Sequence, residues 1–405
     1  MSAKPKITLI TLFMIIVLDA MGFGIIFPVI SPLFMSPEHS ILAANVSVNV
    51  RDLLYALTLG IFAFFMLFGT PIFGDLSDSY GRKSTLFVCL IGTSVGALLC
   101  AFGIKFGSLS LLLFGRALGG MVAGSQPIAQ AAIIDVSTEQ SKTKNLSLIV
   151  LGGSLGFIIG PLIGGYFSDS NISPWFNFST PFYINAGLAV INAIFLMIFF
   201  KDVYQPKFKK AISLTKGIDI FIQALQHKKL KLLIIVLLLS EVAWSTYFQY
   251  EGLYLNQIFD FTARQIGNFL TYMACVFMIT MLFLIRIFLR FFHEKQIILF
   301  SLIIATIGLA LLFVFNFEKM HWLAVWPIAI GVGMSYTALL TCFSRVVSKE
   351  QQGWVMGVSS AVVAASWILG AVLTGTLGLV SREFPFFVSA LLMFFSFILF
   401  LRFRE

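Results

Sequence analysis

Four charged residues interrupt long apolar stretches of the sequence: Asp19, Arg116, Glu241 and Glu251. An ionised side chain near the middle of a bilayer costs about 2.5–3.5 kcal/mol on insertion scales, so such residues are candidates for function by default. Desolvation favours the neutral form of a carboxyl in that setting, which lets the group take up and release a proton. The three acids are therefore candidate proton sites.

Asp19 and Glu241 are the acids expected closest to the middle of the membrane. Each lies well inside its apolar stretch, Asp19 in the first and Glu241 in the seventh. Both are expected to bind a proton or a cationic solute. Glu251 follows Glu241 by about 15 Å at 1.5 Å per residue, on nearly the same helix face as Ser245 and Phe248. Two interpretations of Glu251 remain open, a cavity wall or a solvated position near the outer surface.

Arg116 differs from the acids because its side chain cannot usefully lose its proton. It must therefore be paired or face water. The open alternative is a structural role in which the side chain reaches the outer interface.

Polar and aromatic side chains in the same stretches are candidates for substrate contact. Amides can coordinate a solute or tie helices together. Aromatic rings can form amphipathic walls that attract a basic solute by cation–π interaction. Ordinary packing is the alternative for every one of them. The candidates are Gln126, Gln130, Asn185, Asn192, Trp244, Tyr247, Tyr250, Tyr272, Tyr336 and Trp367.

Histidines and cysteines indicate no further chemistry. All four histidines (His39, His227, His293 and His321) are expected outside the apolar cores, so proton coupling is expected to rest on carboxylates. The four cysteines have no paired spacing, which indicates neither a disulfide framework nor a metal site. The sequence has no Walker pattern, and its glycine runs follow no strand, so no nucleotide site is predicted. We expect no cofactor, no metal and no enzyme activity.

The elements that must position these residues are transmembrane helices. Of the 405 residues, 59% are hydrophobic and 11% are charged, whereas soluble domains carry roughly a quarter charged residues. The apolar blocks have the length that a helix needs to cross a hydrocarbon core about 30 Å thick. The first block is too long for the core of a signal peptide. The expected spans are residues 7–33, 52–73, 84–103, 108–133, 145–168, 182–200, 231–256, 265–289, 296–315, 322–344, 354–379 and 385–402.

The net charge of +9 reports topology rather than a nucleic-acid partner. The first span begins directly after Lys4 and Lys6, which indicates a cytoplasmic amino terminus. Alternating the spans from there places most of the 27 Lys and Arg residues on the cytoplasmic side, as the positive-inside rule requires. Both termini are then cytoplasmic, and a weak attraction to anionic lipid follows.

The chain is predicted to consist of two related six-helix bundles, residues 1–200 and 231–405, joined by a basic cytoplasmic linker at 201–230. Residues 137–140 and 348–351 are similar and lie 211 positions apart, and the glycine-rich segments 160–165 and 370–375 lie 210 apart. Repeated six-helix halves are a transporter architecture whose substrate site lies near mid-membrane between the halves. A helical bundle with coincidental runs of small residues is the alternative.

Four segments, 18–24, 74–83, 116–120 and 156–165, resemble the major facilitator superfamily, and within it the twelve-span drug:proton antiporters. Gly74-Asp75-Leu76-Ser77-Asp78-Ser79-Tyr80-Gly81-Arg82-Lys83 is similar to the family loop pattern G-x-L-a-D-r-x-G-r-r. Arg116-Ala117-Leu118-Gly119-Gly120 is similar to its membrane arginine motif. Gly156-Phe157-Ile158-Ile159-Gly160-Pro161-Leu162-Ile163-Gly164-Gly165 matches the antiporter pattern g-x-x-x-G-P-x-x-G-G. Leu18-Asp19-Ala20-Met21-Gly22-Phe23-Gly24 looks like the opening of tetracycline-efflux proteins.

The resemblance implies the major facilitator fold, a place for Arg116 in the proton path and a conformational role for two motifs. The glycines of span five allow close approach of a neighbouring helix, and Pro161 can kink its helix either as a hinge or as a purely structural bend. The loop is implied to be a latch that stabilises one state. The residues with this role are Gly74, Asp78, Gly81, Arg82, Lys83, Gly156, Gly160, Pro161, Gly164 and Gly165.

Two departures from the family pattern bear on the substrate. Ser79 stands where the family usually has a basic residue, and residues 86–102 and 297–315 lack the acids that tetracycline exporters carry there. The second departure argues against tetracycline as substrate.

The sequence is therefore interpreted as an exporter that exchanges an inward-moving proton for a small amphipathic or cationic solute. It is expected to act as a monomer in the inner (plasma) membrane. Two alternatives stay open. One is a transporter of a metabolite such as a siderophore or organic acid, in either direction. If that substrate is anionic, Arg116 is expected to matter more for its binding than Glu241. The other is a membrane receptor or scaffold that carries no solute.

Overall fold

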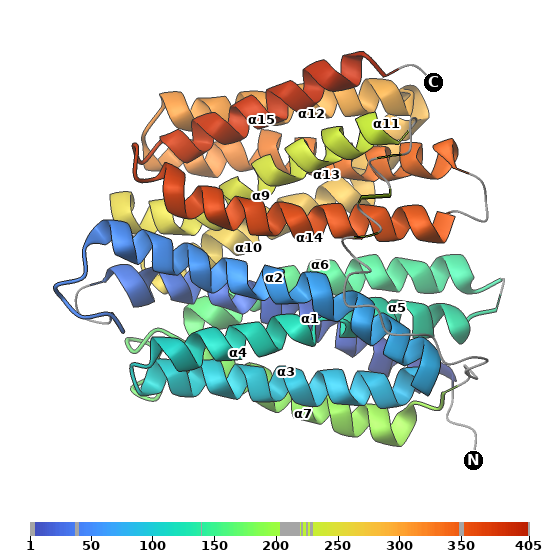
Figure 1. The fold of residues 1–405 in the computed structure, drawn as a ribbon, viewed down its shortest axis with the longest axis horizontal. Helices are drawn as coiled ribbons and strands as arrows, with labels where there is room; N and C mark the ends of the chain where they lie inside the picture. Colours follow the sequence, from blue (N-terminus) through green and yellow to red (C-terminus); the bar gives the residue numbers. More distant parts are fainter. Residues whose placement is uncertain are drawn as a thin grey trace. The chain divides into compact units, whose positions relative to one another are not determined.

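The structure is a computed structural model that describes residues 5–36, 40–138, 140–202, 219, 222–223, 226, 230–347 and 352–403. These residues fold into helices joined by short loops, and no β-strand occurs among them (Figure 1). Twelve helical segments are long and apolar enough to cross a membrane. This confirms the predicted all-α class and the predicted number of spans.

The helices follow the order of the predicted spans. In the first part of the chain they are α1 (Pro5–Met35), α2 (Val48–Tyr80), α3 (Arg82–Lys105), α4 (Leu109–Met121), α5 (Ser125–Asp135), α6 (Lys142–Tyr166) and α7 (Thr180–Phe199). In the second part they are α9 (Lys231–Phe259), α10 (Ala263–Ile279), η1 (Thr280–Leu284), α11 (Ile285–Phe291), α12 (Glu294–Val314), α13 (Glu318–Val346), α14 (Gln352–Leu377) and α15 (Phe384–Leu401).

Two spans are less regular than their hydropathy suggested. The fourth consists of α4 and α5, which are separated at residues 122–124. Pro127 has no N–H to donate to the main chain one turn earlier, which favours a break there. The eighth contains the π-helical turn η1 between α10 and α11. Neither irregularity follows from hydrophobic periodicity, which marks only the apolar length.

The described helices group into two compact units. Unit 1 comprises residues 1–46, 64–214 and 261–271, and unit 2 comprises 47–63, 215–260 and 272–405. In unit 1, α1 packs along α6, and α3 packs against α4 and α7. In unit 2, α9 packs against α14 and α15, and α12 packs against α13 and α15. The pairing of α1 with α6 therefore recurs as the pairing of α9 with α14.

These units differ from the predicted halves in two places, since the first turns of α2 fall in unit 2 and the beginning of α10 falls in unit 1. The division into 1–200, 201–230 and 231–405 remains a prediction. Most of the predicted linker, together with the repeat segment 348–351, lies outside the described residues.

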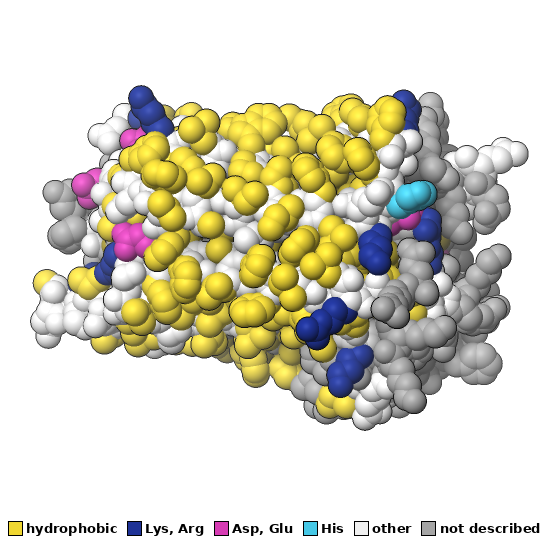
Figure 2. Space-filling view, turned by 90° about the horizontal axis from the view of Figure 1, so that it is seen from above, with side chains coloured by type: hydrophobic (Ala, Val, Ile, Leu, Met, Phe, Trp, Pro, Cys, Tyr) yellow, Lys and Arg dark blue, Asp and Glu magenta, His cyan; other side chains and the backbone are white. Residues whose placement is uncertain are grey.

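Apolar side chains cover the middle of the face shown in Figure 2, and charged side chains gather toward its two ends. Aromatic and aliphatic residues such as Phe114, Ile198, Phe283 and Leu323 are each more than half exposed. Such a band of exposed apolar surface has the character of a lipid-facing surface. The chain is a multi-pass membrane protein.

Candidate functional site

Asp19 stands in the middle of α1, in unit 1. It is half-buried and interacts with Ser125, the first residue of α5, and with Cys89 of α3. The break between α4 and α5 therefore presents the beginning of α5 to the carboxyl group of Asp19. This arrangement gives Asp19 two small polar neighbours.

The glycines of α6 fix the position of α1 around Asp19. A Cβ atom on Gly156, Gly160 or Gly164 would come within 2.5 Å of a main-chain carbonyl oxygen of α1. Only glycine allows two helix backbones to approach this closely, and small residues serve this purpose in membrane helix packing. The span-five motif thus holds the helix that carries Asp19.

α7, which packs against α1, also carries buried amides. Asn185 is 6% exposed, and a Cβ atom on Gly22 of α1 would lie 3.1 Å from its Nδ2. Asn192 is 3% exposed. Gln126 and Gln130 on α5 are half-buried. Unit 1 thus gathers the predicted amide candidates on α5 and α7, the helices that pack beside α1.

Arg116 lies on α4 and is 5% exposed. It interacts with Cys100 of α3, against which α4 packs closely through Gly115. The guanidinium is thus held inside unit 1 rather than at its surface. Its predicted influence on Asp19 stays a prediction.

Glu241 is the corresponding buried acid of unit 2. It lies on α9, is 6% exposed, and interacts with Tyr336 of α13. One turn further along α9, the ring of Trp244 stacks on Phe277 with centroids 5.8 Å apart and contacts Phe248 at 5.5 Å. Glu241 therefore lies beside a continuous aromatic wall.

The wall continues onto α14. The rings of Phe248 and Trp367 meet edge to face at 5.5 Å, and Gln249 donates from Nε2 to the carbonyl of Trp367 at 3.1 Å. Three predicted substrate candidates, Trp244, Tyr336 and Trp367, thus lie on the helices around Glu241. Tyr272 has different neighbours, since its ring contacts Trp322 at 5.4 Å and its hydroxyl donates to the carbonyl of that residue.

Glu251 is not a solvated residue at the surface. It is 0% exposed, and its Oε1 lies 2.8 Å from Nδ1 of His321, which is also 0% exposed. The expectation that all histidines lie outside the apolar cores is therefore wrong for His321. It belongs to the first turn of α13, which begins at Glu318, four residues before the predicted span.

Tyr247 and Tyr250 of α9 are both 0% exposed. Their rings contact Phe386 of α15 at 6.3 and 5.6 Å, and Tyr250 donates its hydroxyl to the carbonyl of Arg382 at 2.9 Å. For these two candidates the described contacts are those of core packing.

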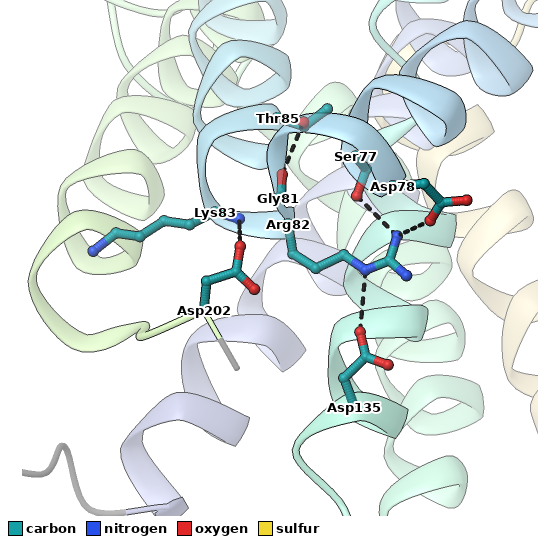
Figure 3. Close-up of polar contacts among 8 residues, drawn as sticks. All are labelled: Ser77, Asp78, Gly81, Arg82, Lys83, Thr85, Asp135 and Asp202. Atoms are coloured by element: carbon teal, nitrogen blue, oxygen red, sulfur yellow. Dashed lines mark hydrogen bonds and ion pairs between the residues drawn. The ribbon is translucent and has the colours of Figure 1, made fainter. Parts of the chain in front are cut away.

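The motif at residues 74–83, which covers the end of α2, Gly81 and the start of α3, forms a network of charged contacts (Figure 3). Arg82 donates from Nη1 to Asp78 at 2.8 Å and to Ser77 at 2.9 Å, and from Nε to Asp135 at 3.1 Å. Because Asp135 ends α5, one guanidinium connects the end of α2 with the end of α5. Planar guanidinium groups suit such multiple acceptors better than ammonium groups do.

Lys83 of this motif binds the end of α7 and the segment that follows it. Lys83 donates its main-chain N–H to Asp202 at 3.0 Å and its Nζ to the carbonyl of Met197 at 2.8 Å. Gly81 joins α2 to α3 with φ +95°, a conformation that L side chains rarely adopt. Gly74 lies within α2.

At the end of α6, residues that were predicted to have a conformational role contact the beginning of α10 within unit 1. A Cβ atom on Gly165 would lie 2.9 Å from the carbonyl oxygen of Ala263, and one on Gly267 would lie 2.5 Å from that of Pro161. Pro161 lies within α6 without ending it. Its role as a hinge remains a prediction.

Sequence reasoning missed the partner of Glu251 because Glu318 and Lys319 made the start of α13 look like a loop. An acidic residue followed by an apolar run is a signal for a helix N-terminus, and this signal could have extended the span to His321. Among the described residues, no group of three His, Cys, Asp or Glu side chains could hold a metal ion.

Comparison with curated proteins shows relatives over nearly the whole chain. Multidrug resistance protein 1 of Bacillus subtilis is 26% identical over 385 residues, covering 95% of this chain and 93% of that protein. The class B tetracycline resistance protein of Escherichia coli is 27% identical, covering 92% and 88%. The quinolone resistance protein NorA of Staphylococcus aureus is 25% identical, covering 93% and 92%.

Solved structures show the same fold at lower identity. A bacterial homologue of the human lysosomal transporter Spinster has a TM-score of 0.78 at 16% identity, covering 99% of this chain and 97% of that one. A D-xylose–proton symporter has a TM-score of 0.75 at 12% identity, covering 98% of both chains.

The family model described as "Major Facilitator Superfamily" matches residues 12–371. Members of this superfamily are carriers of small molecules rather than enzymes. The twelve spans, the glycine-packed α1–α6 pair and this match agree, and the chain belongs to the Major Facilitator Superfamily.

Proposed function

We propose that the protein is a proton-coupled exporter of small amphipathic or cationic organic compounds that works by alternating access. The observation that carries this proposal is Glu241, a carboxyl group 6% exposed beside the aromatic wall of Trp244, Phe248 and Trp367. Aromatic faces and a carboxylate together attract an organic cation. The names of the relatives, which are multidrug, tetracycline and quinolone resistance proteins, support efflux.

The coupling follows from competition for one carboxylate. Glu241 can hold a proton or the cationic group of a solute, but the two compete because each neutralises the same charge. Asp19 offers a second such group in unit 1. A proton that enters down a 100 mV potential contributes about 2.3 kcal/mol, which can drive the solute outward. The transporter acts as a monomer in lipid, in the inner membrane, with both termini cytoplasmic.

Purified protein in vesicles with an imposed pH gradient tests this proposal. We expect Glu241→Gln and Asp19→Asn each to reduce export of a fluorescent lipophilic cation by about tenfold or more, equivalent to about 1.4 kcal/mol of driving or binding free energy. Asp260→Asn is the matched control. Asp260 is exposed and ends α9 with φ 54°, a conformation that Asn also tolerates. Undiminished export in both acid variants would overturn the proposal.

A second function is favoured by Arg116, which is 5% exposed inside unit 1. A buried guanidinium suits recognition of a carboxylate, so an anionic metabolite is the second candidate substrate. Thermal stabilisation of the purified protein by cationic drugs, organic acids and siderophores at two pH values separates the two. Stabilisation by acids that is lost in Arg116→Gln would favour the second function.

A further inference from the structure

Glu251 of α9 and His321 of α13 form a buried ionisable pair in unit 2 that the exporter mechanism above does not use. Their contact joins Oε1 and Nδ1 at 2.8 Å, and both side chains are 0% exposed. Glu251 follows Glu241 along α9 by about 15 Å of helical rise. The pair is therefore a site distinct from the carboxyl group of Glu241.

We infer that Glu251 and His321 together form a proton-binding site that takes up and releases one proton as a unit. The inference rests on the proposed function only for the use made of that proton. Proton binding itself follows from the two side chains and their surroundings.

The charge of the pair changes with one proton. A contact of 2.8 Å between a carboxylate and an imidazole nitrogen needs one proton between them. With that single proton the pair carries a net charge of −1. A second proton, added to Nε2 of His321 or to the carboxylate, makes the pair neutral overall. The protons belong to the pair rather than to either residue, and an apolar interior favours the neutral pair.

The position for the second proton is open. Glu251 Oε2 and His321 Nε2 are both buried, and neither has a hydrogen-bond partner among the described residues. Buried polar atoms are nearly always paired, so two open atoms on one pair require an explanation. When Nδ1 carries the shared proton, Nε2 has a free lone pair and can accept another.

Aromatic rings surround the imidazole of His321. The ring of Tyr254 stacks on it with centroids 5.0 Å apart, and Phe259 and Phe386 lie at 5.5 and 5.7 Å. These rings exclude water and lower the local dielectric, which strengthens the interaction between the two partners.

Two tyrosines and one acid are among the titratable groups near the pair. Tyr247 and Tyr254 of α9 interact with Glu251. Tyr254 donates its hydroxyl to Asn316 at 2.5 Å, and Asn316 donates to Glu383 at 3.2 Å. Glu383, before α15, is half-buried and therefore reaches water. These two hydrogen bonds connect Tyr254, whose ring stacks on His321, with Glu383.

Further charged groups lie at the same end of α9 and α13. Glu318 and Lys319, which precede His321 on α13, are exposed. Tyr250 contacts Tyr254 at 6.0 Å and leads to Arg382 and its partner Asp52. The residue of α15 that contacts His321 is Phe386, whose ring is uncharged. The described partner of Glu251 that can carry a positive charge is therefore His321.

The location suits proton uptake from the outer side. Glu251 is near the end of α9 and His321 is near the start of α13, and the distribution of basic residues predicts this end to be outside. Tyr247 lies between Glu241 and Glu251 on α9, and its hydroxyl is buried without a described partner. The ring of Tyr247 contacts Trp244 at 5.9 Å. Tyr247 thus contacts the aromatic wall beside Glu241 and also interacts with Glu251 of the pair.

Nitrogen NMR of the full chain tests proton binding directly. Replacing His39, His227 and His293 with Gln leaves His321 as the single labelled histidine. Between pH 5 and pH 8, where histidine sites change charge, we expect its signals to convert in one step from neutral imidazole to imidazolium. Glu251→Gln keeps an acceptor for Nδ1–H but removes the charge, so its signals should remain those of neutral imidazole throughout.

Two results would overturn the site. One is an unchanging spectrum in the protein that retains Glu251, whether neutral or charged throughout. The other is the same titration with and without Glu251→Gln. If that variant does not fold, His321→Gln provides a second measurement. Without its partner, Glu251 should be neutral and should show the infrared band of a protonated carboxyl, and a folded variant that lacks this band contradicts the inference.

Transport separates this inference from the proposed function. In vesicles, wild-type export should rise at least about tenfold between external pH 8 and pH 6, the range in which histidine charge changes. Glu251→Gln should reduce that rise to less than about twofold. Wild-type protein without proton-driven export refutes the proposed function and leaves the NMR result intact. An unaltered pH dependence in Glu251→Gln refutes the use of this proton in transport.

Discussion

Asp52 in the first turns of α2 and Arg382 in the loop before α15 form an ion pair across 330 positions of sequence. Nη1 of Arg382 lies 2.6 Å from Oδ2 of Asp52, and Gln257 donates to the other carboxylate oxygen at 2.8 Å. Nearby, Tyr55 donates its hydroxyl to the carbonyl of Gln249 at 2.6 Å. These bonds tie the start of α2 to α9 and the α14–α15 loop within unit 2.

Asp52→Asn should destabilise the protein by about 1.5–3 kcal/mol, the usual contribution of hydrogen bonds to a charged group. The side chain of Asp52 is 1% exposed, so water screens this pair little. The control is Asp169→Asn, which breaks a pair with Arg264, whose side chain is 45% exposed. Such a pair contributes about 0–1 kcal/mol. Equal losses of thermal stability in the two variants would contradict this ranking.

The effect of Asp52→Asn should not depend on pH in the neutral range. Burial alone would lower the pKa of Arg382, but its hydrogen bond to Asp52 and the charge of Asp52 raise that pKa above its ordinary value. A base with a raised pKa contributes stability that is fully present below its ordinary pKa and is lost only as pH rises through the raised value. Melting curves at about pH 7 and pH 9 lie well below the ordinary arginine pKa. If the loss of thermal stability in Asp52→Asn at one pH is only half of the loss at the other, the ion pair with Arg382 is not its cause.

Gly160→Ala should weaken the packing of α1 on α6. The new Cβ atom would lie 2.5 Å from the carbonyl oxygen of Met21, and overpacking of this kind costs about 1–3 kcal/mol. Gly153→Ala on the same helix is the control, since nothing lies within 4 Å of its added atom. Gly160→Ala should have a lower melting temperature and a lower export rate than Gly153→Ala. If Gly160→Ala matches Gly153→Ala in both, close approach of α1 is not the purpose of this glycine.

Gly81→Ala should destabilise the junction of α2 and α3. The φ of +95° disfavours a side chain, and the added atom would lie 2.7 Å from Oδ2 of Asp202. We expect a cost of about 1–2 kcal/mol from backbone strain. Gly74→Ala, which has nothing within 4 Å of its added atom, should be tolerated. The measurement is the melting temperature in detergent, and equal values for the two variants would argue against strain at Gly81.

Trp244→Ala should weaken binding of a lipophilic cation by about 2- to 30-fold, because cation–π attraction contributes about 0.5–2 kcal/mol. Trp175→Ala serves as control, since Trp175 is 86% exposed in the loop before α7. Fluorescence titration of the purified protein measures both dissociation constants. An uncharged ligand of similar shape should lose less affinity than the cation. If the two ligands lose affinity equally, Trp244 contributes apolar contact alone.

Much of the fold could be predicted from the chain because lipid imposes a simple rule. A backbone in hydrocarbon must satisfy its own hydrogen bonds, so each apolar block of sufficient length becomes a helix. The twelve spans and the family resemblance followed from this rule and from the motifs at residues 74–83 and 156–165. The acids Asp19 and Glu241 stood out for the same reason, since a charge in an apolar block is costly.

The partners of these residues were decided by tertiary structure. Hydropathy is a property of neighbouring residues in the sequence, and it does not indicate which side chains of different helices contact one another. It therefore could not pair Glu251 with His321, 70 positions away, or Asp52 with Arg382. It also excluded His321 from the membrane core, because the first turn of α13 is polar in sequence. Burial there depends on the rings of Tyr254, Phe259 and Phe386, which only the packed helices bring around the imidazole.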